Sequence, residues 1–193
     1  MRRLAAVPAE TLAAFVASSS EARVSSVGLP SARGIDHVGL TVPDIAEAAA
    51  FFTEVLGFQE FYAHGPYAKE GDFQTVHFDR RAECIGIRML RTDNLNLELL
   101  QFTSPDQVRT MPKTSDWGSS HLALYVDDMA RAVEHLRACG VRVLGGPLPL
   151  VGPETGPDGE FCFFLTPWSQ AIELVSYPNG KAYEQTTTER LYS

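Results

Sequence analysis

Two histidines and two glutamates occupy matching places in two similar parts of this sequence. His37 is the second residue of the stretch DHVGLTVPD, and His121 is the second residue of SHLALYVDD. Glu98 and Glu173 lie in two apolar stretches, LNLELLQF and QAIELVSY. Imidazole nitrogens and carboxylate oxygens, with positions left for water or a substrate, suit a six-coordinate divalent ion such as zinc, iron, manganese, cobalt or nickel. The pattern therefore predicts one metal site that these four side chains share.

The alternation of side chains along a β-strand would point both histidines away from the core. Successive side chains on a strand face opposite ways. Val38, Leu40 and Val42 therefore share one face, which we expect beneath a helix, and His37 lies on the other. His121 stands in the same relation to the leucines and valine of its own stretch. Taken singly, each histidine would be an ordinary hydrogen-bonded residue, but the repetition favours a shared site.

Both glutamates lie among residues whose side chains belong in a core. Leucine or isoleucine precedes, and leucine follows, both Glu98 and Glu173. A carboxylate ion that is buried without a partner is costly in free energy. We therefore expect each glutamate to be ion-paired, protonated or bound to a cation.

The repeat continues from each histidine-containing strand into a helix. Asp44 and Asp128 occupy N-cap positions, where aspartate is favoured. Apolar residues follow both caps at the i, i+3, i+4, i+7 spacing of a helix with one buried face. Gly57 and Gly140 come where a helix C-terminus prefers glycine. The sequence therefore predicts two helices, each directly after a strand.

Three further strands are predicted after each helix. Those of the first half span 58–63, 84–91 and 95–103, and those of the second half span 141–145, 160–166 and 171–177. The result is an α+β fold of paired βαβββ modules, which we expect to share one sheet because a unit of this size buries little on its own. The expected parts are an N-terminal helical arm (1–33), a first module (34–103), a linker (104–118), a second module (119–180) and a C-terminal tail (181–193).

Composition excludes several classes of partner. The 193 residues carry a net charge of −8, with a pI of about 5.1, so the chain lacks the basic surface that binds nucleic acid or anionic membranes. No stretch approaches the roughly 20 apolar residues of a membrane span. Pro8 and Glu10 interrupt an N-terminal stretch that otherwise resembles an export signal, which favours an amphipathic arm on a cytoplasmic protein. Three widely spaced cysteines in apolar runs favour reduced, buried thiols.

This paired pattern resembles the vicinal oxygen chelate superfamily. DHVGLTVPDIAEAAAFFTEVLGF with LELLQF, followed by SHLALYVDDMARAVEHLRACGV with IELVSY, carries the resemblance over about residues 34–180. It implies an eight-stranded mixed sheet shaped as an open cup, with His37, Glu98, His121 and Glu173 as ligands of one divalent ion. It also implies a small-molecule substrate held through two adjacent oxygens, and a homodimer.

Members of that superfamily with four protein ligands move a proton beside a carbonyl group. A divalent ion stabilises the enediolate that remains when the neighbouring carbon loses its proton. Glu98 and Glu173 are the two candidate bases. We therefore expect a metal-dependent isomerase, and specifically an epimerase. FLTPWSQAIELVSYPNGKAYE resembles a branch with 2-epi-5-epi-valiolone epimerases, enzymes of aminocyclitol pathways that act on cyclic, sugar-derived ketones.

Three other functions are alternatives. A glyoxalase I-like lyase would act on a glutathione hemithioacetal and need cationic groups, for which Arg33, Arg88 and Arg91 are candidates. Extradiol dioxygenases of the superfamily use two histidines and one glutamate, which the fourth ligand disfavours. Antibiotic-binding members without catalysis generally lack the complete ligand set.

Several residues outside the ligand set could lie near the opening of the site. Loops are expected at 62–73 and at 145–160, and the second could act as a lid. His64 and His77 could assist proton transfer, although surface positions are the simpler interpretation. The pocket could also be lined by aromatic residues, namely Trp117, Trp168 and Tyr177.

Overall fold

The computed structural model describes residues 29–67 and 81–192. Most of the predicted N-terminal arm, part of the predicted loop at 62–73, and His77 lie outside the described residues. The chain divides into two units, Met1–Asp36 and His37–Ser193. In the described part of the first unit, the Ala32 N–H donates to the Leu29 carbonyl at 3.1 Å and closes a turn. Both modules belong to the second unit.

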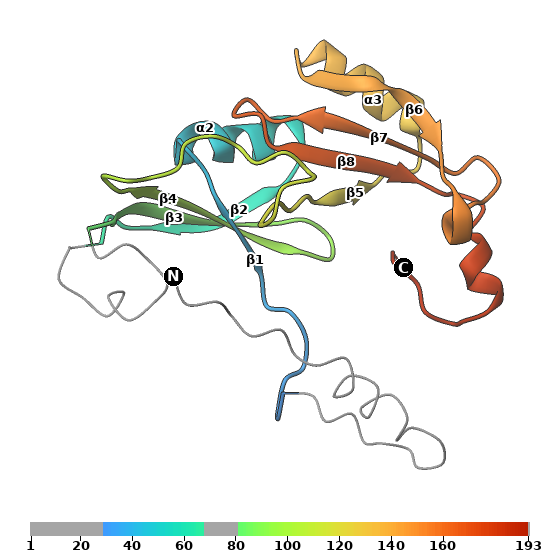
Figure 1. The fold of residues 1–193 in the computed structure, drawn as a ribbon, viewed down its shortest axis with the longest axis horizontal. Helices are drawn as coiled ribbons and strands as arrows, with labels where there is room; N and C mark the ends of the chain where they lie inside the picture. Colours follow the sequence, from blue (N-terminus) through green and yellow to red (C-terminus); the bar gives the residue numbers. More distant parts are fainter. Residues whose placement is uncertain (1–28, 68–80, 193) are drawn as a thin grey trace, which may run out of the picture. The chain divides into compact units, whose positions relative to one another are not determined.

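The first module is a four-stranded sheet with a helix on one face. Its elements are β1 (Val38–Thr41), α2 (Ile45–Ala50), a π-helical turn (Phe51–Val55), β2 (Gln59–His64), β3 (Glu83–Arg91) and β4 (Asn96–Thr103). The strands lie in the order β1-β4-β3-β2, with β1 parallel to β4 and the other pairs antiparallel. Asp44 caps α2 as predicted, because its Oδ1 accepts hydrogen bonds from two backbone N–H groups at 2.9 Å. Figure 1 shows α2 against one face of this sheet.

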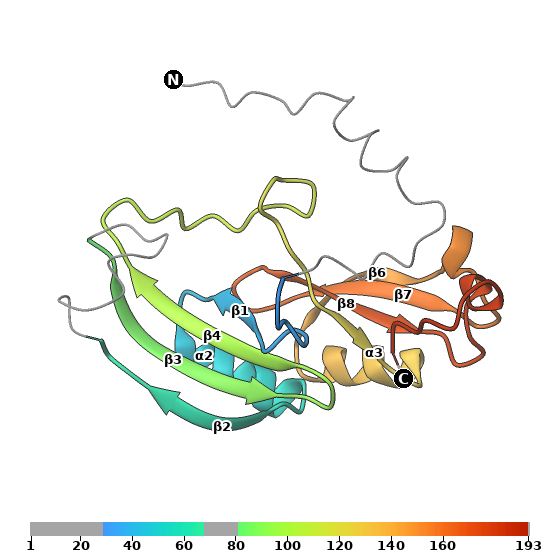
Figure 2. The same cartoon turned by 90° about the horizontal axis from the view of Figure 1, so that it is seen from below.

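The second module repeats this plan. It comprises β5 (Ala123–Tyr125), α3 (Met129–Ala138), β6 (Arg142–Pro149), a 3-10 helix (Gly152–Glu154), β7 (Glu160–Leu165), β8 (Ala171–Ser176) and a 3-10 helix (Ala182–Gln185). Its strand order is β5-β8-β7-β6, with β5 parallel to β8. Asp128 Oδ1 accepts from the Arg131 N–H at 3.0 Å. In both modules the sheet is highly twisted and its helix covers one face (Figure 2).

The paired βαβββ fold is confirmed, with two differences of detail. Hydrogen bonding divides the eight strands into two four-stranded sheets and does not join them into one. Strand β6 continues to Pro149, beyond the predicted end at 145, because its pairing with β7 resumes at Leu148 after a register shift. A shift of this kind breaks the alternation from which strand ends are predicted.

The two modules share one hydrophobic core although their sheets are separate. Phe52 is fully buried and packs against Phe58 and Trp168, with ring centroids at 5.2 and 6.2 Å. His135 Nε2 lies 2.8 Å from the Val55 carbonyl oxygen, which joins α3 to the end of the first helix. A shared core explains how two small units can be stable together.

Two further expectations concern the cysteines and membrane spans. Cys84 and Cys162 are buried as expected, but Cys139 is exposed at the C-terminal end of α3; all three are free. No helix among the described residues is long and apolar enough to span a membrane.

Phe52 offers a test of the shared core. Phe52→Ala should lower the free energy of unfolding by about 3–5 kcal/mol, because it removes a ring that contacts side chains of both modules. Denaturant titration followed by circular dichroism measures the loss. Val108→Ala, in the exposed linker, is the matched control. A loss below about 1 kcal/mol for Phe52→Ala would mean that the modules do not depend on this contact.

Candidate metal centre

The first histidine–glutamate pair is formed by the parallel neighbours β1 and β4. His37 directly precedes β1, and its Nε2 lies 3.4 Å from Glu98 Oε2. Gly39 stands opposite Glu98 in the strand register. A Cβ atom at Gly39 would lie 3.5 Å from Glu98 Oε2, which is an ordinary van der Waals contact. Gly39 therefore borders the carboxylate of the first pair.

The second pair repeats this arrangement with His121, which lies two residues before β5 and not on the strand, and Glu173 of β8. His121 Nε2 lies 3.2 Å from Glu173 Oε2. Ala123 stands opposite Glu173, where Gly39 stands in the first module. The His121 ring also meets the edge of Phe163, with centroids 5.6 Å apart. Both glutamate side chains are about four-fifths buried and both histidine side chains about three-fifths.

Burial changes the pKa of the carboxyl group in the second pair. Removal from water raises the pKa of Glu173, and this effect exceeds the opposing influence of nearby His121. Glu154 also raises the pKa of Glu173, whereas Lys181 lowers it. Glu173 therefore holds a proton more readily than an exposed glutamate, unless a cation binds beside it.

Each pair fits one side of a divalent-cation site. Nitrogen and oxygen ligands lie about 2.1 Å from such an ion, so two of them at a right angle are about 3.0 Å apart. The observed separations of 3.2 and 3.4 Å are close to this value. Among the described residues, however, no three His, Cys, Asp or Glu side chains are grouped so as to hold a metal ion. The structure thus forms two pairs, and their convergence on one ion stays a prediction.

A cavity of about 480 Å³ adjoins the second pair. Glu173, Tyr125 and Tyr177 line it together with Lys181 and Glu154. Lys181 and Glu154 were not singled out in the sequence, because burial of a lysine beside a loop glutamate depends on contacts between distant segments. Tyr177 was expected near the pocket, and it does line this cavity.

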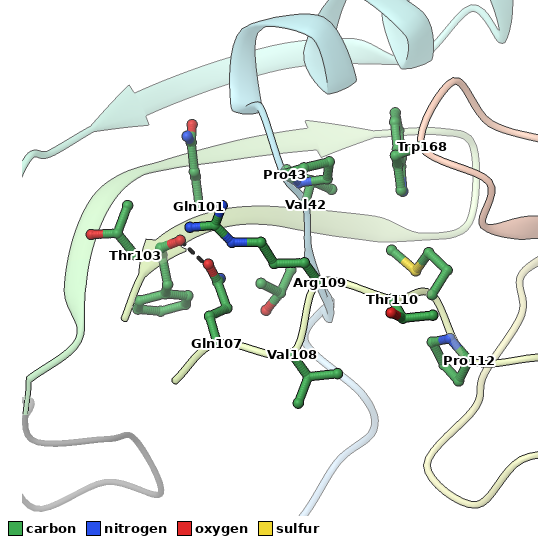
Figure 3. A pocket seen from close by; sticks show the side chains of 13 residues that line it. Val42, Pro43, Gln101, Thr103, Gln107, Val108, Arg109, Thr110, Pro112 and Trp168 are labelled. Atoms are coloured by element: carbon green, nitrogen blue, oxygen red, sulfur yellow. Dashed lines mark hydrogen bonds between the residues drawn. The ribbon is translucent and has the colours of Figure 1, made fainter. Parts of the chain in front are cut away.

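A second cavity, of about 560 Å³, lies between the ends of β1 and β4 and the linker. Figure 3 shows Arg109 and Gln107 of the linker beside Gln101 and Thr103 of β4, with Trp168 at the far side. Gln107 Nε2 donates to the Phe102 carbonyl at 2.9 Å and holds the linker to β4. The residues that line this cavity include neither histidine–glutamate pair.

The other residues named from the sequence are dispersed. Arg88 forms an ion pair with Glu60 at 3.0 Å, and Arg91 is exposed. Arg33 lies in the first unit. The His64 ring contacts the Tyr67 hydroxyl, and Trp117 is fully exposed.

Comparisons with known proteins agree with this fold. Residues 36–163 match the family described as Glyoxalase/Bleomycin resistance protein/Dioxygenase superfamily. A protein from Actinomyces sp named 2-epi-5-epi-valiolone epimerase is 44% identical over 169 residues, which cover 86% of this chain and 91% of that protein.

Solved structures with low sequence identity share the fold. A glyoxalase family protein from Bacillus cereus aligns with a TM-score of 0.60 at 17% identity, covering 77% of this chain and 98% of that one. A glyoxylase/bleomycin resistance protein/dioxygenase domain from Frankia sp. aligns with a TM-score of 0.52 at 21% identity, covering 76% and 99%.

Metal affinity tests the two pairs. Glu98→Gln and Glu173→Gln should each weaken binding of Mn²⁺ or Co²⁺ by about tenfold or more, because even residues that only support a ligand contribute that much. Isothermal titration of the chelator-treated protein measures the dissociation constant. Glu134→Gln, exposed on α3, is the control. Unchanged affinity in both site variants would remove these glutamates from the ligand set.

Proposed function

Because the chain belongs to the glyoxalase/bleomycin resistance protein/dioxygenase superfamily, the vicinal oxygen chelate group that its sequence resembles, we propose that it is a metal-dependent epimerase. It inverts a carbon next to the ketone of a cyclic, sugar-derived substrate of the 2-epi-5-epi-valiolone type. The observation that carries the proposal is the extensive similarity to a relative named as such an epimerase. The two histidine–glutamate pairs support it independently, since they supply ligands and a base.

Glu173 is the favoured base. It lines the cavity of about 480 Å³, where a substrate would lie, whereas Glu98 is not among the described residues of that lining. The glutamate removes the proton from the carbon beside the ketone, which leaves an enediolate. Return of a proton to the opposite face of that carbon gives the epimer. Glu98 is then a ligand and the candidate for the second proton transfer.

His37, Glu98, His121 and Glu173 would hold the ion. Bound there, a divalent cation supplies positive charge where negative charge develops on the substrate oxygens. The histidines then serve as neutral nitrogen ligands, and each keeps its neighbouring carboxylate in position. The ion pair between Arg88 and Glu60 weighs against the glyoxalase alternative, because it engages one of the three arginines expected to bind glutathione carboxylates.

A homodimer would complete the site. Each pair supplies two ligands, and a second copy could contribute the other two. Strand β2 supports an interface at the first module, since all six of its residues are exposed, including Phe61 and Tyr62. An exposed edge strand with large apolar side chains is a surface that proteins usually cover.

Deuterium exchange tests the reaction. Incubation of the metal-loaded protein with 2-epi-5-epi-valiolone in deuterated water should replace the proton on the inverted carbon, observed as loss of its NMR signal. Chelator should abolish exchange and added divalent ion should restore it, while Glu134→Gln should exchange like the wild type. Absence of exchange, together with consumption of the methylglyoxal–glutathione adduct, would favour the lyase.

Subunit complementation tests whether two copies share the site. Glu98→Gln and Glu173→Gln homodimers should each be strongly impaired. If each site takes one pair from each copy, a mixed dimer has one site with both substitutions and one with neither. Random reassociation of an equal mixture makes half of the dimers mixed, so mixing after mild dissociation should restore up to about a quarter of the wild-type activity. A mixture as inactive as its components would place each complete site within one chain.

A further inference from the structure

The cavity beside Glu173 contains a buried ammonium group with hydrogen-bonding capacity to spare. The Lys181 side chain is only 2% exposed. Its Nζ lies 3.2 Å from Glu154 Oε2 and 4.2 Å from the centre of the Tyr177 ring. An ammonium group has three N–H donors, and these two contacts occupy two of them. Among the described residues no protein acceptor takes the third, and Lys181 lines the cavity.

Close backbone packing fixes this lysine beside Glu154. The Ala182 N–H donates to the Thr155 carbonyl at 2.7 Å, which ties the residue after Lys181 to the loop that carries Glu154. A Cβ atom at Gly156 would lie 2.0 Å from the Gly180 carbonyl oxygen, so only glycine permits this approach. The donor is therefore held in place before any ligand binds.

The charges around the cavity are mostly negative. Three carboxylates line it, those of Asp93, Glu154 and Glu173. Lys181 is the sole cationic residue among the described residues in its wall, and Glu154 already neutralises it. Without the divalent ion, a phosphate or carboxylate group would find no unpaired cation among the described residues of this wall. Hydroxyl groups, in contrast, can donate to Glu154 and accept from Lys181.

The C-terminal tail closes one side of the same cavity. Tyr192 stacks on Tyr125, with ring centroids 4.6 Å apart at an interplanar angle of 12°. Its hydroxyl lies 3.4 Å from Asp93 Oδ2. The volume of about 480 Å³ falls within the roughly 300–1,000 Å³ of small-molecule sites. The cavity thus offers aromatic walls and a polar end, as a hydroxylated ring requires.

From these observations we infer that this cavity binds the hydroxyl groups of the substrate, with Lys181 as donor and Glu154 as acceptor. It selects an uncharged polyhydroxylated ring over one that carries phosphate or carboxylate. Lys181 is a positioning residue, since it orients the ring while Glu173 acts on the carbon. The inference rests on the proposed function, because that function identifies the reaction. The preference for neutral over anionic ligands can be tested without it.

The first experiment compares Lys181→Met with Lys113→Met, a change at an exposed linker lysine. For 2-epi-5-epi-valiolone, Lys181→Met should lower kcat/KM by about tenfold or more, mostly through KM, because it removes a charged donor to the substrate. Lys113→Met should match the wild type. Lys181→Arg keeps the charge and should recover part of the loss, and it serves as the test if the Met variant does not fold. A folded Lys181→Met protein within twofold of the wild type would overturn the inference.

The second experiment needs no turnover. Calorimetric titration of the chelator-treated protein with myo-inositol 1-phosphate should show weak or no binding to the wild type. Glu154→Gln frees the Lys181 charge and should strengthen binding about fivefold or more, and the double variant with Lys181→Met should lose that gain. Equal affinity of the wild type and Glu154→Gln for myo-inositol 1-phosphate would overturn the inferred preference for neutral ligands. If Glu154→Gln binds the phosphate more tightly but the wild type shows no deuterium exchange with 2-epi-5-epi-valiolone, only the proposed reaction is rejected.

Discussion

Each sheet carries a glutamate on an interior strand, and the structure depends on a partner for the charge of that carboxylate. Glu98 and Glu173 lie on β4 and β8, each of which has a strand on both sides, and buried leucine or isoleucine side chains flank them. Such a group needs a partner, because an uncompensated buried charge is costly. In both modules the partner is a histidine brought in by the neighbouring parallel strand. The parallel pairing of β1 with β4 and of β5 with β8 makes this possible.

The two modules keep the same pair in different surroundings. In the first, the edge strand β2 is exposed along its whole length. In the second, the pair adjoins a cavity that holds Lys181 and two tyrosines, and burial raises the pKa of Glu173. This asymmetry fits a division of labour in which both modules contribute ligands and the second also binds and deprotonates the substrate.

Local patterns predicted much of this arrangement. The N-caps at Asp44 and Asp128 and the order of the strands along the chain follow from alternation and capping, which are short-range effects. What the sequence could not provide depends on distant contacts. The separation into two sheets, the extension of β6 past its register shift, the exposure of Cys139 and the burial of Lys181 are of this kind.

The central claim is that both histidine–glutamate pairs bind one cation. Anomalous diffraction from crystals of the manganese- or zinc-loaded protein tests it most directly, since it locates the ion independently of the protein atoms. One strong peak per site is expected, about 2.0–2.2 Å from an imidazole nitrogen and a carboxylate oxygen of each pair. A peak beside only one pair, or ions bound separately at the two, would contradict it.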